Sequence, residues 1–243
     1  MTAPETPQLS LVIPAYNEEQ RLPGSLEKIA EFCKGREFPV EVVVVVEKST
    51  DRTLELAMQA ASKQANFVVI ENAVQLGKGH AVRTGMLRAS GASVFYMDAD
   101  LSVPLDEIQG FLDYFERHPE VAVLFGNRRH PESNILRRQN RVRQGMGRIF
   151  NGILRFLAPV AIMDTQCGFK AFRREAAREI FSRQQLDGFA FDVEVLFLAE
   201  QLGFKAVDLP VRWINSPESK VRIVRDSLRM LVDILRLRRL KHP

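Results

Sequence analysis

The strongest constraint on the fold of this chain is a run of β-branched apolar residues in its first quarter. Six of the seven residues in Val40–Val46 are valine, and further short apolar segments alternate with helical patterns along the first half. A strand that is apolar on both faces is typical of a parallel sheet covered by helices on both sides. The alternation therefore predicts an α/β chain with a Rossmann-like, mostly parallel central sheet, whose ligands bind at the carboxyl ends of the strands.

The expected elements divide the chain into two halves. In the first half we expect strands at Leu9–Tyr16, Val40–Val46, Phe67–Ile70, Val94–Met97 and Val121–Phe125. The helices between them are expected from about Glu18 to Cys33, at Asp51–Lys63, at Lys78–Ala89, and from Pro104 to near His118. In the second half we expect a basic helix at Arg137–Leu157, strands at Gly168–Arg173 and Ala206–Trp213, and helices at Arg174–Phe181, Phe191–Gln201 and Val221–Leu240.

The last of these helices is expected to be amphipathic, because an apolar stripe runs along it at helical spacing. The stripe consists of Val224, Leu228, Leu231 and Leu235. No repeat, low-complexity tract or linker interrupts the chain, so we expect one domain over residues 1–243. Within it, residues 9–128 would bind the nucleotide sugar suggested by the motifs below, and residues 129–243 an acceptor.

Composition indicates a protein of the cytoplasm. Hydrophobic residues make up 46% of the chain and charged residues 26%, as is usual for a soluble globular protein. Two cysteines are too few for a disulfide scaffold, which favours a reducing compartment. Residues 1–8 show no signal-peptide pattern, and no apolar run approaches the roughly 18 residues that span a bilayer.

Basic residues are concentrated in two segments. Residues 128–155 hold eight arginines and one acid, and residues 220–241 hold eight basic residues and two acids. Such segments indicate an anionic partner, which could be nucleic acid, a lipid phosphate or a membrane surface. Two solvated helix faces are the alternative. No nucleic-acid motif or aromatic-interleaved basic patch is present, so we expect no nucleic-acid partner.

An acidic triplet follows the expected strand Val94–Met97. Asp98 and Asp100 are two residues apart, so a strand ending there delivers both carboxylates to one side of the sheet edge. Hard oxygen ligands in such a place suit Mg²⁺ or Mn²⁺, and these ions usually carry substrate phosphates. Other strand ends contribute the segments 14–18, 47–51 and 77–80, where Lys78 can meet a phosphate. Together they fit a nucleoside diphosphate.

These segments resemble motifs of the inverting family 2 glycosyltransferases, which have the GT-A fold. Leu11–Glu18 is similar to the opening motif of that family, and Asp98-Ala99-Asp100 to its metal motif. Further segments are similar to dolichyl-phosphate β-glucosyltransferases, namely Gly77–Met86, Asp164–Lys170, Phe191–Glu194 and Arg225–Met230. The resemblance implies transfer of a hexose, taken as glucose from UDP-glucose, to a polyprenyl (dolichyl-like) phosphate.

The resemblance also implies roles for individual residues. It gives a metal site for Mg²⁺ or Mn²⁺ at Asp98 and Asp100. The nucleotide sugar would be bound by Pro14, Ala15, Tyr16, Glu18, Glu47, Lys78, Asp98 and Ala99. The catalytic set would be Asp100, Asp164, Gln166 and Arg128. The acceptor phosphate would be held by Arg128, Arg137, Arg138, Arg141 and Lys220.

Several alternatives stay open at this stage. Glu47 stands where the family usually has aspartate, which leaves the nucleotide base undetermined. Asp192 and Glu194 are as compatible with capping a helix as with a functional role, and His80 is expected to be a bystander. The basic helices would place the enzyme peripherally on the cytoplasmic face of an anionic membrane. An enzyme of the same fold with another sugar or a soluble acceptor is the first alternative function, and a non-enzymatic nucleic-acid-binding module, suggested by the basic segments alone, is the second.

Overall fold

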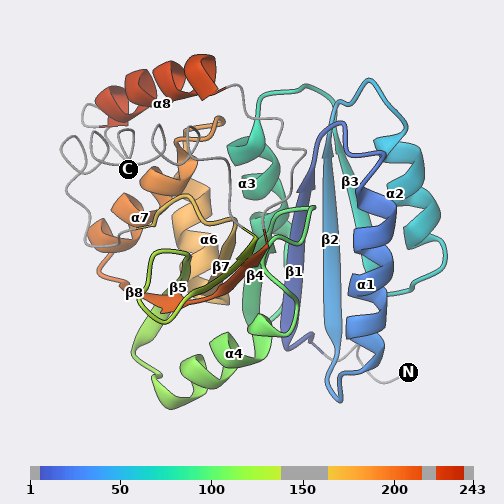
Figure 1. The fold of residues 1–243 in the computed structure, drawn as a ribbon, viewed down its shortest axis with the longest axis horizontal. Helices are drawn as coiled ribbons and strands as arrows, with labels where there is room; N and C mark the ends of the chain where they lie inside the picture. The colour runs from blue at the N-terminus through green and yellow to red at the C-terminus, as the bar shows by residue number, and fades with distance from the viewer. Residues whose placement is uncertain (1–5, 138–163, 215–222, 238–243) are drawn as a thin grey trace.

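A seven-stranded sheet forms the centre of the molecule. The computed structural model describes residues 6–137, 164–214 and 223–237 (Figure 1). The strand order is β3-β2-β1-β4-β7-β5-β8, and every neighbouring pair is parallel except those that involve β7. The bounds of these strands are β1 Leu9–Ala15, β2 Val40–Glu47, β3 Phe67–Asn72, β4 Ser93–Met97, β5 Val121–Asn127, β7 Phe169–Arg173 and β8 Lys205–Pro210. The α/β class and the mostly parallel sheet are therefore confirmed.

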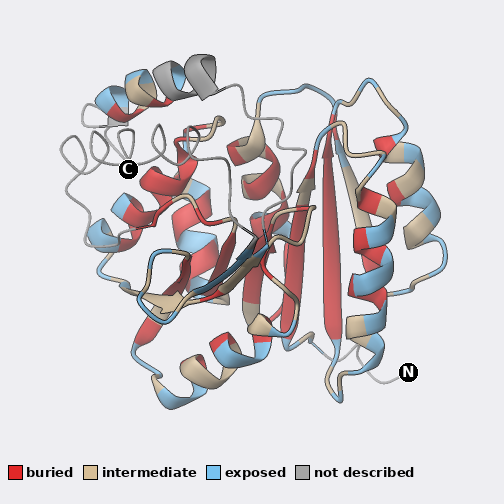
Figure 2. Ribbon diagram, in the orientation of Figure 1, coloured by how far each residue is buried: buried red, intermediate tan, exposed pale blue. Residues whose placement is uncertain are grey.

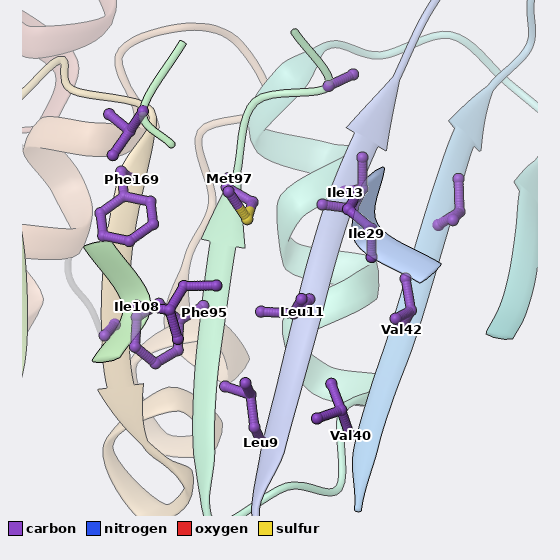
Figure 3. Close-up of a cluster of buried hydrophobic side chains, with 14 of the residues drawn as sticks. Leu9, Leu11, Ile13, Ile29, Val40, Val42, Phe95, Met97, Ile108 and Phe169 are labelled. Atoms are coloured by element: carbon purple, nitrogen blue, oxygen red, sulfur yellow. The ribbon is translucent and has the colours of Figure 1, made fainter. Parts of the chain in front are cut away.

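Helices cover both faces of the sheet, and each face has its own hydrophobic cluster (Figures 1 and 2). In β2, Val43 and Val45 pack toward α3 and the later helices, whereas Val42 and Val44 pack toward the face of α1 and α4. Figure 3 shows the second cluster, in which Leu11 and Ile13 of β1 lie beside Val42. The valine run is thus apolar on both sides because both sides are covered.

The helices lie where the sequence pattern predicts them, and α3, α6 and α7 begin at the expected residues. The bounds are α1 Leu22–Lys34, α2 Thr53–Ala61, α3 Lys78–Arg88, α4 Glu107–Arg117, α6 Arg174–Arg183, α7 Phe191–Gln201 and α8 Ile223–Leu237. α1 begins four residues later than expected, because the backbone N–H groups of Glu18 and Glu19 bond to Thr53 and Asp51 on the neighbouring loop. α4 likewise begins at Glu107 and not at Pro104.

The expectations were wrong at two places in the second half. The single strand expected at Ala206–Trp213 is divided into β8 and a short β9, Arg212–Ile214, because the N–H of Val211 bonds to the Ser133 hydroxyl. β9 pairs with β6, Asn134–Arg137. Arg137 therefore ends a strand, whereas we expected it to begin a helix. The rest of that expected basic helix lies outside the described residues.

Among the described side chains of the terminal helix, the buried ones are Met230 and Ile234, which are not part of the expected stripe. Met230 and Ile234 are buried against the α7 side of the sheet, whereas Leu235 is half exposed. The side chains of Val224 and Leu228 lie outside the described residues. Within residues 6–137, 164–214 and 223–237, none of the helices has the length and apolar character that crossing a membrane requires.

Candidate active site

The loops that follow β1 and β2 are joined by hydrogen bonds at the carboxyl edge of the sheet. Asn17 has a left-handed backbone with φ of 52°. Its N–H donates to the Ser49 hydroxyl at 3.1 Å, and its side-chain oxygen accepts from the N–H of Thr50 at 2.8 Å. Pro14 and Ala15 end β1 just before this turn, and Tyr16 is exposed. The predicted nucleotide-binding segment 14–18 is therefore held in one shape against the loop after β2.

The two carboxylates of the acidic triplet lie at this same edge. Asp98 forms an ion pair with Lys78, in which Nζ of Lys78 lies 2.6 Å from Oδ1 of Asp98. Asp100 accepts a hydrogen bond from the N–H of Ser102, and its Oδ2 is 3.7 Å from a guanidinium nitrogen of Arg21. The side chains of Asp98 and Asp100 are 37% and 19% exposed. Both are therefore accessible to a ligand, and both have cations beside them.

Gly168 sets the position of the Asp98 carboxylate. A Cβ at Gly168 would lie 2.0 Å from Oδ2 of Asp98, so any other residue would displace this carboxylate. The N–H of Asp98 also donates to the carbonyl of Gly168 at 3.0 Å. The glycine of the motif Asp164–Lys170 is thus required for a close approach between β7 and the end of β4.

The donor atoms fit a divalent ion that is shared with a ligand. In the part of the chain that the structure describes, no three His, Cys, Asp or Glu side chains gather as a complete metal site. Mg²⁺ commonly binds through one or two carboxylates together with waters and substrate phosphates, and does not need an all-protein cage. Asp98 and Asp100 provide such a pair of hard oxygen donors. The site suits an ion that arrives with a phosphorylated substrate.

Lys78 is the cation closest to these carboxylates. It is the first residue of α3 and follows Gly77. The φ of Gly77 is 139°, a backbone conformation that residues with a side chain rarely adopt. Burial opposes the charge on Lys78, but the carboxylates of Asp98 and Asp192 outweigh it, so the pKa of Lys78 is raised above its ordinary value. Lys78 is therefore a permanent cation at the amino end of a helix, where anions are favoured.

Glu47 is used within the protein. Its carboxylate is buried and accepts hydrogen bonds from Asn72 at 2.7 Å and from the backbone N–H groups of Leu76 and Gly77 at 2.7 and 3.3 Å. It also bonds to Nδ1 of His80 at 2.7 Å. Glu47 thus shapes the segment before α3 that carries Lys78. The expected contact of Glu47 with the nucleotide stays a prediction, and His80 belongs to this hydrogen-bond network.

Arg128 and Asp164 form the second charged pair. The guanidinium donates two hydrogen bonds of 2.8 Å to the carboxylate, and lies over the ring of Trp213 at 5.6 Å. Burial disfavours the charged form of Asp164, but the Arg128 guanidinium outweighs it and lowers the pKa of Asp164. Asp164 therefore stays ionised and unsuited to taking a proton. Of the other predicted catalytic residues, Gln166 reaches the carbonyl of Phe189 at 3.5 Å.

A buried polar cluster that the sequence did not predict lies behind Asp98. Lys170 of β7 is fully buried, and its ammonium contacts Tyr96 of β4 and Asp192 of α7. Burial and the Asp192 carboxylate raise the pKa of Tyr96 well above its ordinary value, so the phenol keeps its proton. A lysine within the apolar run 169–172 was the available signal.

Two further residues behave as structural ones. Burial raises the pKa of the Cys167 thiol to about 12, as expected for an unreactive buried cysteine. Glu194 is buried in the first turn of α7 and accepts hydrogen bonds from the backbone of Gln185 and Leu186. It therefore holds the loop before the helix.

The predicted acceptor residues are only partly in view. Arg128 is described with its contacts, and Arg137 is placed only as the last residue of β6. Arg138, Arg141 and Lys220 lie outside the described residues. Their predicted contact with an acceptor phosphate stays a prediction.

Known proteins are similar to this chain over most of its length. Residues 10–181 match the family described as glycosyl transferase family 2. The chain is 34% identical to the dolichyl-phosphate β-glucosyltransferase of Drosophila melanogaster over 225 residues, which are 88% of this chain and 69% of that protein. It is 32% identical to the Homo sapiens enzyme of the same name over 244 residues, covering 96% of this chain and 75% of that protein.

Solved structures give the same fold at lower identity. Mannosyl-3-phosphoglycerate synthase from Rubrobacter xylanophilus superposes with a TM-score of 0.69 at 21% identity, over 97% of this chain and 76% of that one. Glucosyl-3-phosphoglycerate synthase from Mycobacterium tuberculosis gives 0.63 at 19% identity, over 94% and 80%. The chain belongs to glycosyl transferase family 2 and is a glycosyltransferase of the GT-A fold.

Proposed function

We propose that this enzyme transfers glucose from UDP-glucose to a polyprenyl phosphate, with inversion at the anomeric carbon. The observation that carries the proposal is the arrangement of Asp98, Asp100 and Lys78 at one sheet edge, a set of charges suited to a metal-bound diphosphate. The acceptor and the sugar are supported by relatives named dolichyl-phosphate β-glucosyltransferases. The donor is supported by a fold neighbour crystallised with Mn²⁺ and UDP-glucose.

The reaction is a single displacement. An oxygen of the acceptor phosphate attacks C1 of the sugar, a new C1–O bond forms, and the bond to the diphosphate breaks with its electron pair leaving on the diphosphate. The attacking phosphate is already an anion at neutral pH, so a strong general base is unnecessary. This fits Asp164, which is ionised and bound to Arg128. We assign Asp164 to orienting Arg128, whose remaining donors would meet the acceptor phosphate.

The leaving diphosphate must be stabilised as its charge grows. Asp98 and Asp100 would hold a divalent ion, and that ion would neutralise the diphosphate. Lys78, fixed at the start of α3 by the loop that Glu47 organises, would contact the same diphosphate. The segment Pro14–Glu18 would line the nucleotide. Gln166 would lie beside the sugar, near the carbonyl of Phe189.

A lipid acceptor also implies a location. We propose that the enzyme works as a peripheral protein on the cytoplasmic face of a membrane. In this proposal, α8 and the basic segments contact the membrane surface. The exposed Val232 and Leu235 on α8, next to the exposed Arg236, support this placement. The side chains of Met230 and Ile234, on the core side of the same helix, would fix its orientation.

A soluble phosphorylated acceptor is the second candidate. It is favoured by the fold neighbour crystallised with phosphoglyceric acid and UDP-glucose. The Arg128–Asp164 pair would serve a phosphate on either acceptor.

One set of assays separates the two. Thermal shift with UDP and GDP, each with and without Mn²⁺, identifies the base and the metal, since a ligand of the native state raises the melting temperature. Labelled UDP-glucose is then offered with dolichyl phosphate in micelles or with 3-phosphoglycerate. We expect labelled lipid that requires Mn²⁺ or Mg²⁺, with a β linkage by NMR. Transfer to 3-phosphoglycerate alone, or full transfer in excess chelator, would contradict the proposal.

A further inference from the structure

A buried triad of Tyr96, Lys170 and Asp192 lies directly behind the acidic motif. The Lys170 ammonium is fully buried and donates to the Tyr96 hydroxyl at 2.6 Å, to Oδ1 of Asp192 at 2.5 Å, and to the carbonyl of Cys167 at 2.7 Å. The Tyr96 hydroxyl donates to the same Asp192 oxygen. All three protons of the ammonium are therefore used. The triad joins β4, β7 and α7 at one point.

A triad of this kind is a poor way to stabilise a fold. Removing an ammonium and a carboxylate from water is costly, and apolar residues of similar volume often stabilise a core at least as well. The surroundings would accept apolar replacements, because Phe125 and Phe191 are fully buried beside the triad. The distinctive contact is the third one, in which Lys170 binds the backbone of the loop after Asp164.

That contact leads to the metal motif. The carbonyl held by Lys170 belongs to Cys167, and the next residue is Gly168. The carbonyl of Gly168 accepts a hydrogen bond from the N–H of Asp98, and the Cα of Gly168 lies against the Asp98 carboxylate. On the other side, Lys78 pairs with Asp98 and lies 5.7 Å from the centre of the Tyr96 ring. The two residues that contact Asp98, Gly168 and Lys78, are thus both adjacent to the triad.

We infer that Lys170 is a positioning residue, which holds Asp98 in the orientation that binds the divalent ion by fixing the Cys167–Gly168 backbone. This inference rests on the proposed role of Asp98. Tyr96 and Asp192 complete it by holding the ammonium in place. Without Lys170, the carbonyl of Cys167 loses its partner, Gly168 is free to shift, and the carboxylate above it loses its fixed orientation.

The test replaces the whole triad with apolar residues, in the variant Tyr96→Phe/Lys170→Met/Asp192→Leu. The readout is Mn²⁺ affinity in the presence of UDP, measured by the electron paramagnetic resonance of free Mn²⁺. We expect this affinity to fall by about 10- to 100-fold, the usual effect of losing a group that orients a metal ligand. UDP affinity without metal should change far less. Lys170→Met/Asp192→Asn, which leaves Tyr96 a partner, is measured alongside in case the triple variant folds poorly.

Ser10→Ala is the matched control, because Ser10 belongs to another buried polar cluster, with Glu41 and Gly91, at the opposite edge of the sheet. It should lose stability and keep its Mn²⁺ affinity. A folded triad variant with wild-type Mn²⁺ affinity would overturn the inference while leaving the proposed function standing. Failure of the wild-type protein to bind Mn²⁺ with UDP would instead remove the metal role of Asp98, and the inference with it.

Discussion

The Arg128 guanidinium and the Asp164 carboxylate face each other through two parallel hydrogen bonds of 2.8 Å, and the N–H of Arg128 adds a third at 3.0 Å. The carboxylate is 2% exposed and the guanidinium side chain 27%. The Asp164 carboxylate therefore lies on the buried side of the pair, and the Arg128 guanidinium lies on the side that faces solvent. Such a pair fixes the direction of a positive charge, as an enzyme that binds a phosphate acceptor requires.

Arg128→Lys tests this arrangement. Lysine keeps the charge but cannot form both bonds to Asp164 at once, so its ammonium is left without a fixed direction. We expect kcat/KM for the acceptor to fall by about 10- to 100-fold, equivalent to one hydrogen bond to a charged group. Arg178→Lys, on the exposed side of α6, is the control and should be unchanged. Equal transfer rates for both variants would exclude the assigned role.

Gly168→Ala tests the close approach to Asp98. Its Cβ would meet the carboxylate at 2.0 Å, so Asp98 must turn away. We expect loss of Mn²⁺-dependent UDP binding by calorimetry, with the circular dichroism spectrum unchanged. Gly110→Ala in α4 has open space around its Cβ and should instead stabilise the protein by about 0.5–1 kcal/mol. Unaltered metal-dependent binding in Gly168→Ala would show that Asp98 is not a ligand in this orientation.

The sequence predicted the sheet well because the signal for it is local. The valines of β2 and the run before Asp98 are apolar on both faces, and α7 was placed at its observed bounds, Phe191–Gln201. The direction of β7 could not be predicted, because an apolar run reads the same whether the strand is parallel or antiparallel. The position of β7 between β4 and β5 depends on contacts between residues far apart in the sequence, which a local pattern does not report.

The sequence predicted the location of residues that directly follow a strand. It did not predict contacts between residues that come from distant segments. Asp98 and Lys78 were both expected at the sheet edge and do contact each other. Lys170 meets Tyr96 from 74 positions away, and no local pattern reports such a contact. Glu47 was predicted to contact the nucleotide from the resemblance, and its contacts with Asn72 and His80 come from segments that no local pattern connects to it.

Glu194 predicts a pH dependence of stability. Burial raises the pKa of Glu194 from an ordinary value of 4.5 to about 6 in the folded protein. The folded state therefore holds this proton more tightly than the unfolded state. The resulting stabilisation is complete below pH 4.5 and is lost as the pH rises through about 6.

The shift corresponds to about 2 kcal/mol of unfolding free energy. Glu194→Gln has no proton to lose, so its stability should lack this decline. Urea unfolding of both proteins at several pH values across this window measures the difference. Parallel stability curves for the two proteins would mean that Glu194 titrates normally.

The terminal helix provides the last prediction, because its two sides differ. Met230 and Ile234 are 6% and 0% exposed, whereas Val232 and Leu235 are 48% and 50% exposed. Among the described side chains of α8, Val232 and Leu235 are the exposed apolar ones that a membrane could contact. We expect Val232→Ser/Leu235→Ser to weaken binding to vesicles that contain anionic lipid, with stability within about 0.5 kcal/mol of wild type. Sedimentation with vesicles and urea unfolding measure the two quantities.

Ile234→Ala is the opposite case, since it should cost about 2–5 kcal/mol of stability by leaving a cavity under the helix. Its vesicle binding, measured well below its unfolding temperature, should stay close to wild type. Binding of the wild-type protein should weaken as salt is raised, because each basic residue near an anionic surface contributes about 1 kcal/mol that salt screens. Equal sedimentation with neutral and anionic vesicles, or none with either, would favour the soluble acceptor, because an enzyme that takes a lipid phosphate from a bilayer has to reach its surface.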